Sequence, residues 1–449
     1  MTALVDRLSA VVGSGYVSTD PDVLTSRCVD WTGRYRGTAS ALIRPGDAEE
    51  VAAVLATCRD GGVAVTVQGG RTSLVAGTVP ENGDVLLSTE RLDRIGEIDT
   101  VERQVRVDAG VTLAALQRLA SNAGLQFGVD LAARDSATIG GMAATNAGGL
   151  RTVRYGTMSA QVLGLDVALP DGSLVRRHPR VRHDNTGYDL AALFVGAEGT
   201  LGVITGLDLR LYPLPAHRVT ALCGFADLEA LVSAGRALRD LASIAALELI
   251  DARGAALAAE HLDVPSPVSG DWLLLAELAG ESDHTEQLAA ALSGAPLHGP
   301  PAVGTDLSAQ QRLWQVREAM ADVVGIFGPP LKFDVSLPLS AIAEFAAESA
   351  ALIARCAPDA APLLFGHVGE GNLHLNVLRC DDRQEAAIYP AMMELIAAHG
   401  GNVSSEHGVG SRKRAYLAMS RQPVDIAVMR TIKAALDPVG YLNPAVLFD

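Results

Sequence analysis

The sequence predicts an α+β fold with more than one domain. A chain of 449 residues is longer than a domain with a single hydrophobic core usually is, and its hydrophobic content of 49% is enough to form two such cores. Between Ala41 and Leu211, short β-rich runs alternate with helical stretches and glycine-rich turns. After the segment YPLP at 212–215, strands are separated by long alanine-rich helices with few glycines. We therefore expect a domain boundary between Leu214 and Pro215.

The elements of the first half follow from local signals. Asp47 is a suitable N-cap for a helix that Gly61 would end, and the run VAVTV from Val63 is typical of a buried strand. Two further strands precede Thr112, which can cap a helix ending at Gly124. These elements do not form one strict series of parallel βαβ units.

The second half contains strands, helices and one hairpin. Strands are predicted at 217–225, 271–278 and 331–337, and a helix is predicted at 309–327. From about residue 400, glycine, histidine and proline again become dense, which suggests that the C-terminal part of the chain returns to the active site.

Charge and composition exclude several kinds of partner. The 52 acidic and 36 basic residues give a net charge of −16, which opposes binding to nucleic acid or anionic lipid. No apolar run approaches the roughly 20 residues of a membrane helix, and the N-terminus does not resemble a signal peptide, so a cytoplasmic location is expected. The five scattered cysteines are expected to be buried thiols in a reducing compartment.

Three glycine-rich segments are candidate cofactor-binding loops. The first, VQGGRTSLVAGTVP at 67–80, directly follows a strand, and its backbone N–H groups and Arg71 could hold a diphosphate. One such loop alone is more often a tight turn. The segments at 130–156 and 195–205 repeat the pattern and favour backbone lying flat against a ligand.

A histidine hairpin is predicted at 365–377, where FGHVGEGNLHLNV has two apolar-alternating runs around a four-residue turn. Its expected register places His367 opposite His374, with Asn376 on the same face. Farther along the chain, Glu406 and His407 add a carboxylate and an imidazole, and both can reach one site only from a turn. Two histidines and a carboxylate suit zinc or another first-row divalent ion.

Taken together, these segments resemble the FAD-linked oxidases with a vanillyl-alcohol-oxidase type of FAD-binding domain, a group that includes D-2-hydroxyglutarate, D-lactate and glycolate dehydrogenases. The resemblance runs from about Trp31 to Pro444. It implies a two-subdomain FAD-binding domain at 1–214, an α+β substrate-binding cap domain with an antiparallel sheet at 215–399, and a C-terminal helical segment at 400–449 that packs on the FAD site. No histidine stands in the first loop, so non-covalent FAD is expected.

The resemblance also implies roles for individual residues. It makes His367, His374 and Glu406 metal ligands, with zinc expected first and manganese as the alternative. Catalytic and substrate-binding roles are implied for His407 as the base, Asn376 as a substrate contact, and Arg317 and Lys332 as carboxylate binders. FAD contacts are implied for Gly69, Gly70, Arg71, Thr72, Ser73, Gly77, Thr78, Asp130, Ser136, Gly140, Gly141, Thr145, Asn146, Gly149, Glu198, Gly202, Ile204 and Asn443.

The activity that this resemblance implies is the oxidation of a D-2-hydroxy acid, of the D-2-hydroxyglutarate or D-lactate type, to the 2-oxo acid by hydride transfer to flavin N5. Ala321 stands where the glutarate enzymes tend to carry a hydroxyl residue, so the substrate remains open. Electron-transferring flavoprotein or a quinone is the expected acceptor, and a homodimer is an expected assembly. The alternatives are an FAD-dependent alkyl transferase and a non-catalytic subunit of a complex of the glycolate oxidase type.

Overall fold

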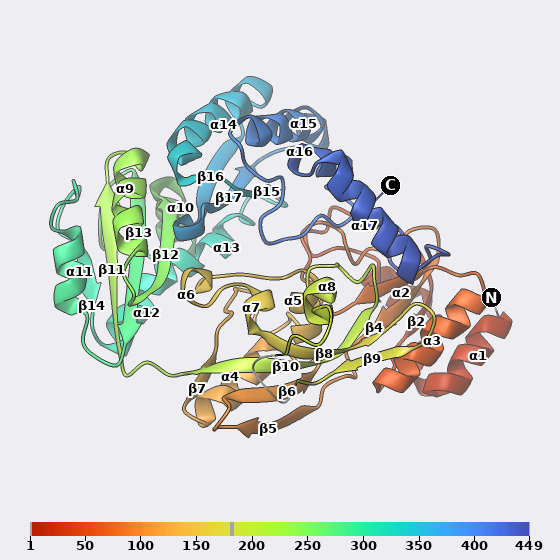
Figure 1. Cartoon of the computed structure of the whole chain (residues 1–449). Coiled ribbons are helices and arrows are strands. Elements are labelled where there is room, and N and C mark those ends of the chain that lie inside the picture. The colour runs from red at the N-terminus through yellow and green to blue at the C-terminus, as the bar shows by residue number, and fades with distance from the viewer. Residues whose placement is uncertain (1, 180–183, 449) are drawn as a thin grey trace. The chain divides into compact units, whose positions relative to one another are not determined.

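The computed structural model describes residues 2–179 and 184–448, and the chain divides into two compact units. The first unit comprises 1–148, 156–214 and 406–449, and the second comprises 149–155 and 215–405. Helices and strands alternate in both (Figure 1), which confirms the α+β prediction. The short stretch 149–155, which includes α6 (Thr152–Tyr155), is an excursion of the chain into the second unit.

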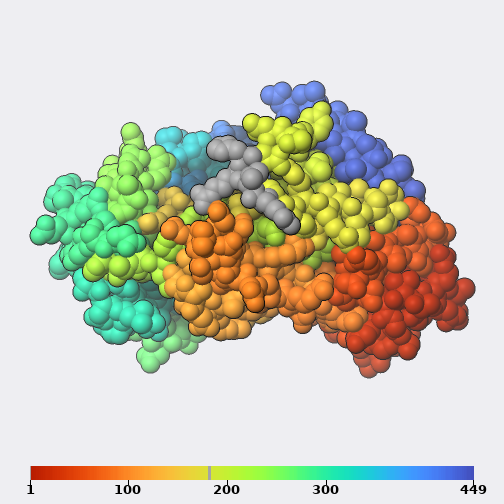
Figure 2. All heavy atoms as spheres, turned by 60° about the horizontal axis from the view of Figure 1, so that its bottom comes forward, coloured from red at the N-terminus to blue at the C-terminus, as the bar shows by residue number. Residues whose placement is uncertain are grey.

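The first unit begins with a four-stranded sheet in the order β1-β2-β4-β3. Strands β2 (Ala39–Ile43), β4 (Asp84–Ser88) and β3 (Val65–Gln68) are parallel, and β1 (Val17–Ser18) is antiparallel to β2. Helices α1 (Thr2–Val12) and α3 (Ala48–Asp60) pack against each other and share a core with these strands. The N-terminal residues, red in Figure 2, form part of the surface.

A second sheet in this unit has the order β5-β6-β10-β8-β9, with β7 pairing to the end of β10. Its strands are β5 (Ile95–Asp99), β6 (Gln104–Asp108), β7 (Leu125–Phe127), β8 (Val162–Ala168), β9 (Leu174–Arg177) and β10 (Val203–Pro213). Its core includes buried side chains from α4 (Leu113–Asn122), α5 (Ile139–Ala144) and α8 (Leu190–Phe194).

The C-terminal segment completes the first unit. After α17 (Pro423–Leu436), the backbone of Tyr441 and Asn443 bonds to Val65 on the open edge of β3, with N···O distances of 2.9 and 2.8 Å. The Asn443 side chain accepts from the N–H of Val67 and donates to the carbonyl of Glu198. One asparagine thus links β3 to the turn that precedes β10.

The second unit is built on a seven-stranded antiparallel sheet in the order β14-β11-β13-β12-β16-β17-β15. The strands are β11 (His217–Phe225), β12 (Ile244–Asp251), β13 (Trp272–Gly280), β14 (Ala302–Gly304), β15 (Leu331–Ser336), β16 (Ala361–His367) and β17 (Asn372–Leu378). On one face lie α9 (Leu228–Arg239), α14 (Ile342–Cys356) and α15 (Asp382–Ala398); on the other lie α10 (Ala252–Leu262), α12 (Leu307–Glu318) and α13 (Met320–Val323) (Figure 1). Helix α11 (Thr285–Leu292) packs on α9.

Most local predictions are confirmed. Asp47 caps α3 and Thr112 caps α4 through side-chain bonds to backbone N–H groups, and strands form at all three sites predicted in the second half. The helix predicted over 309–327 is instead divided near Ala319 into α12 and α13.

Two bulk predictions can also be compared with the structure. Cys28, Cys58, Cys223 and Cys380 are buried, but Cys356, the last residue of α14, is only half-buried because its helix ends near the surface. Across residues 2–179 and 184–448, no helix is both long and apolar enough to cross a bilayer.

Candidate functional site

The glycine-rich segments come together in the first unit. A Cβ on Gly70 would lie 1.9 Å from the carbonyl oxygen of Ser136, and one on Gly69 would lie 2.5 Å from the Thr138 hydroxyl. The first loop therefore packs backbone to backbone against the second segment. Gly77 lies beside Gly410 in the same way, with 3.6 Å from its Cβ position to the Gly410 Cα.

The backbone around this meeting point is well suited to a flavin dinucleotide. From Gly69 to Leu74, no N–H group donates a hydrogen bond to any residue that the structure describes, so six consecutive amides remain for an anion. Four residues other than glycine in these segments, and one in the C-terminal segment, adopt a positive φ, a conformation that concentrates at functional sites. They are Arg71, Ala76, Asn146, Glu198 and Asn443.

Two charged residues predicted to contact FAD have partners within the protein. The Arg71 guanidinium donates to the carbonyl of Ser26 at 2.9 Å. The Glu198 carboxylate accepts from the N–H groups of Val409 and Gly410, both at 2.8 Å. Burial raises the pKa of Glu198, and these two hydrogen bonds oppose that rise. Glu198 therefore fixes the backbone that directly follows Glu406 and His407.

The other predicted FAD contacts are spread over the same segments. Asp130 accepts from Gln117, Thr145 donates to the carbonyl of Gly141, and Asn146 accepts from the N–H of Ser159. Thr72, Ser73 and Thr78 lie in the first loop, Gly140 and Gly141 in α5, and Gly202 and Ile204 at the start of β10. Gly149 is the exception, because it belongs to the second unit.

Gly70→Ala is expected to disrupt the first unit. The new methyl group would collide with backbone, which cannot move aside as a side chain can, so we expect a loss of about 3 kcal/mol or more in unfolding free energy and a loss of bound flavin. Thermal unfolding and flavin absorbance measure both. Gly15→Ala, with nothing within 4 Å of its Cβ position, is the matched control and should behave as wild type. A stable, flavin-loaded Gly70→Ala protein would contradict the close packing of the two segments.

In the second unit, polar side chains form a band across one face of the seven-stranded sheet. The register pairs Lys332 with Asn376 and Asp334 with His374. Side chains alternate across a strand, so these four share one face with Phe365, which is opposite His374. The band continues through three other strands, and we define it by seven polar residues of this face: Lys332, Asp334, His374, Asn376, His367, Glu248 and Glu277.

The histidine hairpin forms, but with a different register from the predicted one. His367 is opposite Asn372, and His374 is opposite Phe365. The reason is the turn: residues 368–370 form a 3₁₀ turn closed by Gly371 at φ 73°, so the strand pairing shifts by two residues. A two-residue shift keeps both histidines on one face. Their ring centroids are 5.3 Å apart, with the rings nearly perpendicular.

A candidate metal-binding group gathers at the end of this band. Asn402 bonds to the backbone of Ser336 on β15, and the N–H of Ser405 donates to Asp334 at 3.0 Å. Glu406 and His407 follow directly on bends of the chain, as the turn prediction requires. One ligand atom from each of four residues lies within 4.8 Å of the others; the residues are Asp334, His374, Glu406 and His407.

This group differs from the predicted ligand set in three residues. It includes Asp334, which lies in the strand predicted at 331–337 and had no predicted role, and His407, which was predicted to be the catalytic base. His367 is outside the group, although its ring lies next to that of His374.

Two buried carboxylates on the same face, Glu248 and Glu277, were not predicted from the sequence. Glu248 accepts from Arg317 and lies 2.7 Å from the Nδ1 atom of His367. The Glu277 carboxylate forms ion pairs with Arg151 and Arg218 and accepts a hydrogen bond from the Trp314 indole N–H. Burial raises the pKa of Glu277, but the charges of the two arginines outweigh burial and lower the pKa to about 2. Each is a single acid in an otherwise apolar run, IAALELI or LLLAELA. A buried charge of this kind must have partners, so a signal was present in the sequence.

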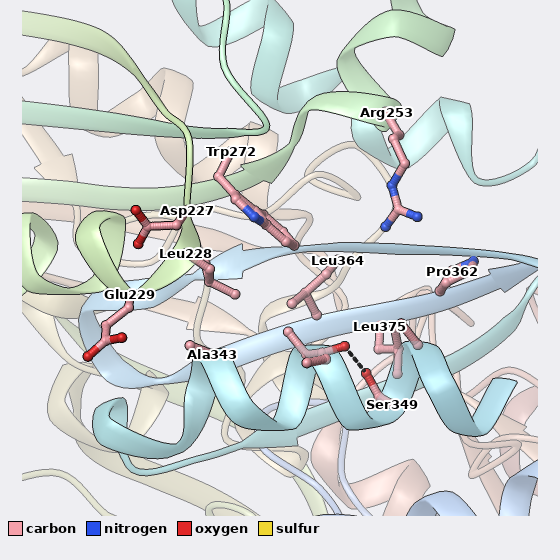
Figure 3. A pocket seen from close by; sticks show the side chains of 13 residues that line it. Asp227, Leu228, Glu229, Arg253, Trp272, Ala343, Ser349, Pro362, Leu364 and Leu375 are labelled. Carbon is pink, nitrogen blue, oxygen red and sulfur yellow. Dashed lines mark hydrogen bonds between the residues drawn. The ribbon is translucent and has the colours of Figure 1, made fainter. Parts of the chain in front are cut away.

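A pocket of about 490 Å³ lies on the opposite face of this sheet (Figure 3). It is lined by Leu364 and Leu375, which alternate with Phe365 and His374, together with α14 and the start of α9. None of the predicted site residues lines it. The pocket and the polar band are therefore separated by the thickness of the sheet.

Comparison with known proteins supports the FAD-binding interpretation. The family model described as "FAD binding domain" matches residues 39–177, and that of "FAD linked oxidases, C-terminal domain" matches residues 214–447. A D-2-hydroxyglutarate dehydrogenase of Stutzerimonas stutzeri is 34% identical over 459 residues, covering 99% of both chains. The mitochondrial D-2-hydroxyglutarate dehydrogenase of Bos taurus is 37% identical, covering 98% of this chain and 82% of the relative.

Solved structures show the same fold at low identity. A p-cresol methylhydroxylase with substrate bound has a TM-score of 0.84 at 18% identity, covering 100% of this chain and 97% of that one. An alkyldihydroxyacetonephosphate synthase has a TM-score of 0.75 at 16% identity, covering 99% and 84%. At such identities the likeness concerns the fold alone.

Proposed function

Because this chain belongs to the family of FAD-linked oxidases, we propose that it is an FAD-dependent dehydrogenase that oxidises a D-2-hydroxy acid to the 2-oxo acid. The observation that carries the proposal is the polar band of the second unit, in which Lys332 shares a sheet face with Asp334 and His374, two residues of the candidate metal-binding group. The D-2-hydroxyglutarate dehydrogenases among the relatives make that acid, with D-lactate, the first substrates to test.

In this proposal the substrate carboxylate binds to Arg317, with Lys332 as the second cation. A guanidinium offers two parallel donors to a carboxylate, and Arg317 is held against the Phe365 ring, with 4.9 Å from Cζ to the ring centroid. Its Nη1 and Nη2 atoms donate no hydrogen bond to any residue in the described ranges. Asn376, on the strand next to Lys332, is proposed to contact the substrate through its amide.

The substrate hydroxyl is proposed to lie at the histidine end of the band. A divalent ion, zinc or manganese, would supply Lewis acidity there, held by His374 and Glu406 with His367 or Asp334 as a further ligand. His407 is proposed to take the hydroxyl proton. The Nε2 atom of His407 is 3.7 Å from Oε1 of Glu406, so the proposed base lies next to a proposed metal ligand.

FAD bound to the glycine-rich segments of the first unit would supply the acceptor for the C2 hydride. The chain's part is to present the run of amides from Gly69 to Leu74 to the diphosphate and to hold Asn443 and Glu198 in place. Electron-transferring flavoprotein or a quinone is proposed as the acceptor that reoxidises the protein, and a homodimer as its assembly.

Anaerobic bleaching of the flavin by a panel of D- and L-2-hydroxy acids tests the proposal. We expect rapid bleaching by at least one D-acid, abolished by a chelator and restored by Zn²⁺ or Mn²⁺. A flavin that none of these acids reduces would contradict the dehydrogenase assignment and favour the alkyl transferase or the non-catalytic subunit.

His374→Ala is expected to remove the metal without affecting the bound flavin. His374 lies in the second unit, whereas the FAD segments lie in the first, so FAD content should stay at the wild-type level while metal content and flavin reduction are lost. Elemental analysis, the flavin spectrum and single-turnover reduction measure the three quantities. His298→Ala changes an exposed histidine of the same unit and should leave all three unchanged. Full activity without metal in His374→Ala would rule out the metal's role.

A further inference from the structure

Glu248 occupies an unusual place in the second unit. It lies in the middle of β12, is fully buried, and stands in the run IAALELID, where its neighbours on the strand are apolar. A buried carboxylate is costly unless its oxygens are satisfied by charged or hydrogen-bonding partners. The identity of those partners therefore indicates why the charge is there.

Each oxygen of Glu248 has one partner. Oε2 accepts from Nε of Arg317 at 2.6 Å, and Oε1 lies 2.7 Å from Nδ1 of His367. Burial alone would raise the pKa of Glu248, but the charges and hydrogen bonds of His367 and Arg317 lower it. Its contact with the permanently charged guanidinium of Arg317 at 2.6 Å makes Glu248 the counter-charge of that arginine, a carboxylate. A carboxylate can only accept, which makes His367 a donor through Nδ1.

The two contacts with Glu248 involve Nε of Arg317 and Nδ1 of His367, which are not the atoms that would bind a substrate carboxylate or a metal ion. Arg317 is bound through Nε, so both terminal nitrogens of its fork remain for a ligand carboxylate. A histidine that donates through Nδ1 has Nε2 as its lone-pair nitrogen, the arrangement that orients histidine ligands of metals. The side chains of Arg317 and His367 are each 7% exposed, so the contacts of both residues with Glu248 lie in the interior of the unit, away from water.

We infer that Glu248 is a positioning residue that fixes Arg317, the proposed carboxylate binder, relative to His367, whose ring lies next to that of the potential metal ligand His374. The inference rests on the proposed function. A 2-hydroxy acid carries its carboxylate and hydroxyl on adjacent carbons, so the groups that bind them need a fixed separation. One rigid carboxylate bonded to both residues provides that separation. Acids with the hydroxyl one carbon farther along are excluded for the same reason.

The test is Glu248→Gln, which preserves shape but replaces one accepting oxygen with a donating amide. We expect metal affinity, measured by titration of the apoprotein with Zn²⁺ or Mn²⁺, to fall about tenfold or more. At saturating metal, the KM for the D-2-hydroxy acid should rise at least tenfold, with a smaller change in kcat. The ratio of kcat/KM for the 2-hydroxy acid to kcat/KM for the corresponding 3-hydroxy acid should become smaller than in the wild type.

Asp251→Asn is the matched control. Asp251 is a buried carboxylate on the same strand and binds Arg253, but its side chain points to the opposite face. It should share any general loss of stability and leave metal affinity and KM at wild-type values. Glu248→Asp keeps the charge, but its side chain is one methylene too short to bond to both Arg317 and His367. We therefore expect this variant to keep either the wild-type metal affinity or the wild-type KM, but not both.

The outcomes separate this inference from the proposed function. A wild-type flavin that no 2-hydroxy acid reduces overturns both. An active, metal-dependent wild type whose Glu248→Gln and Glu248→Asp variants keep metal affinity and KM within twofold overturns the positioning role alone. If Glu248→Gln does not fold, Glu248→Asp decides by the same two measurements.

Discussion

Replacing His407 with glutamine is expected to slow flavin reduction about 10²- to 10⁴-fold, the usual effect of removing a general base. Glutamine is close to histidine in size but cannot take the substrate proton. The expected result therefore includes unchanged FAD content and unchanged metal content. Single-turnover reduction at saturating substrate and elemental analysis of the same preparation measure the effect.

The metal content of this variant decides between two roles for His407. Its ring nitrogen lies in the same group of potential ligand atoms as Asp334, His374 and Glu406. If His407→Gln loses metal together with activity, His407 is a ligand and the base must be sought elsewhere. His298→Gln, at an exposed position of the second unit, serves as the control for the loss of an imidazole.

Glu277→Ala is expected to be the most destabilising change in the second unit. Glu277 binds Arg151 at 2.5 Å, Arg218 at 2.7 Å and the Trp314 indole N–H at 2.9 Å. Its removal leaves two half-buried guanidinium groups without their shared counter-charge. Breaking a buried ion pair from one side costs about 3–5 kcal/mol, which chemical denaturation would measure. Glu281→Gln, four residues farther along on an exposed turn, should change stability by less than about 0.5 kcal/mol.

The same carboxylate predicts how wild-type stability depends on pH. Its pKa of about 2 lies below the ordinary value of 4.5, so it contributes stability fully above about pH 4.5 and loses it as the pH falls toward 2. The difference corresponds to roughly 3 kcal/mol. Stability curves of wild type and Glu277→Ala should converge over this range. Parallel curves would contradict the assignment.

The parts of the fold that could be predicted from sequence depend on neighbouring residues. Asp47 and Thr112 cap helices because their side chains reach N–H groups three residues away, a contact that is visible in any single sequence. The hairpin register could not be predicted in the same way. It depends on whether the chain turns over residues 369–372, as predicted, or over 368–371, as observed, and glycines at 369 and 371 allow both.

The parts of the site that were missed depend on strand order. Glu248 meets His367 only because β12 and β16 are adjacent in the sheet although 119 residues separate the two side chains. Glu198 was expected to contact FAD, yet its carboxylate binds amides more than 200 residues farther along. A single sequence gives the residue types for such contacts but not the partners.

The return of the C-terminal segment to β3 has a consequence for how the protein is made. Val67 bonds to Asn443, which lies 376 residues farther along the chain and is synthesised only after the second unit. The second unit is synthesised in between, almost entirely as one stretch. The first unit therefore cannot close this sheet edge before the second unit has been synthesised, and the second unit is the first of the two that can be completed.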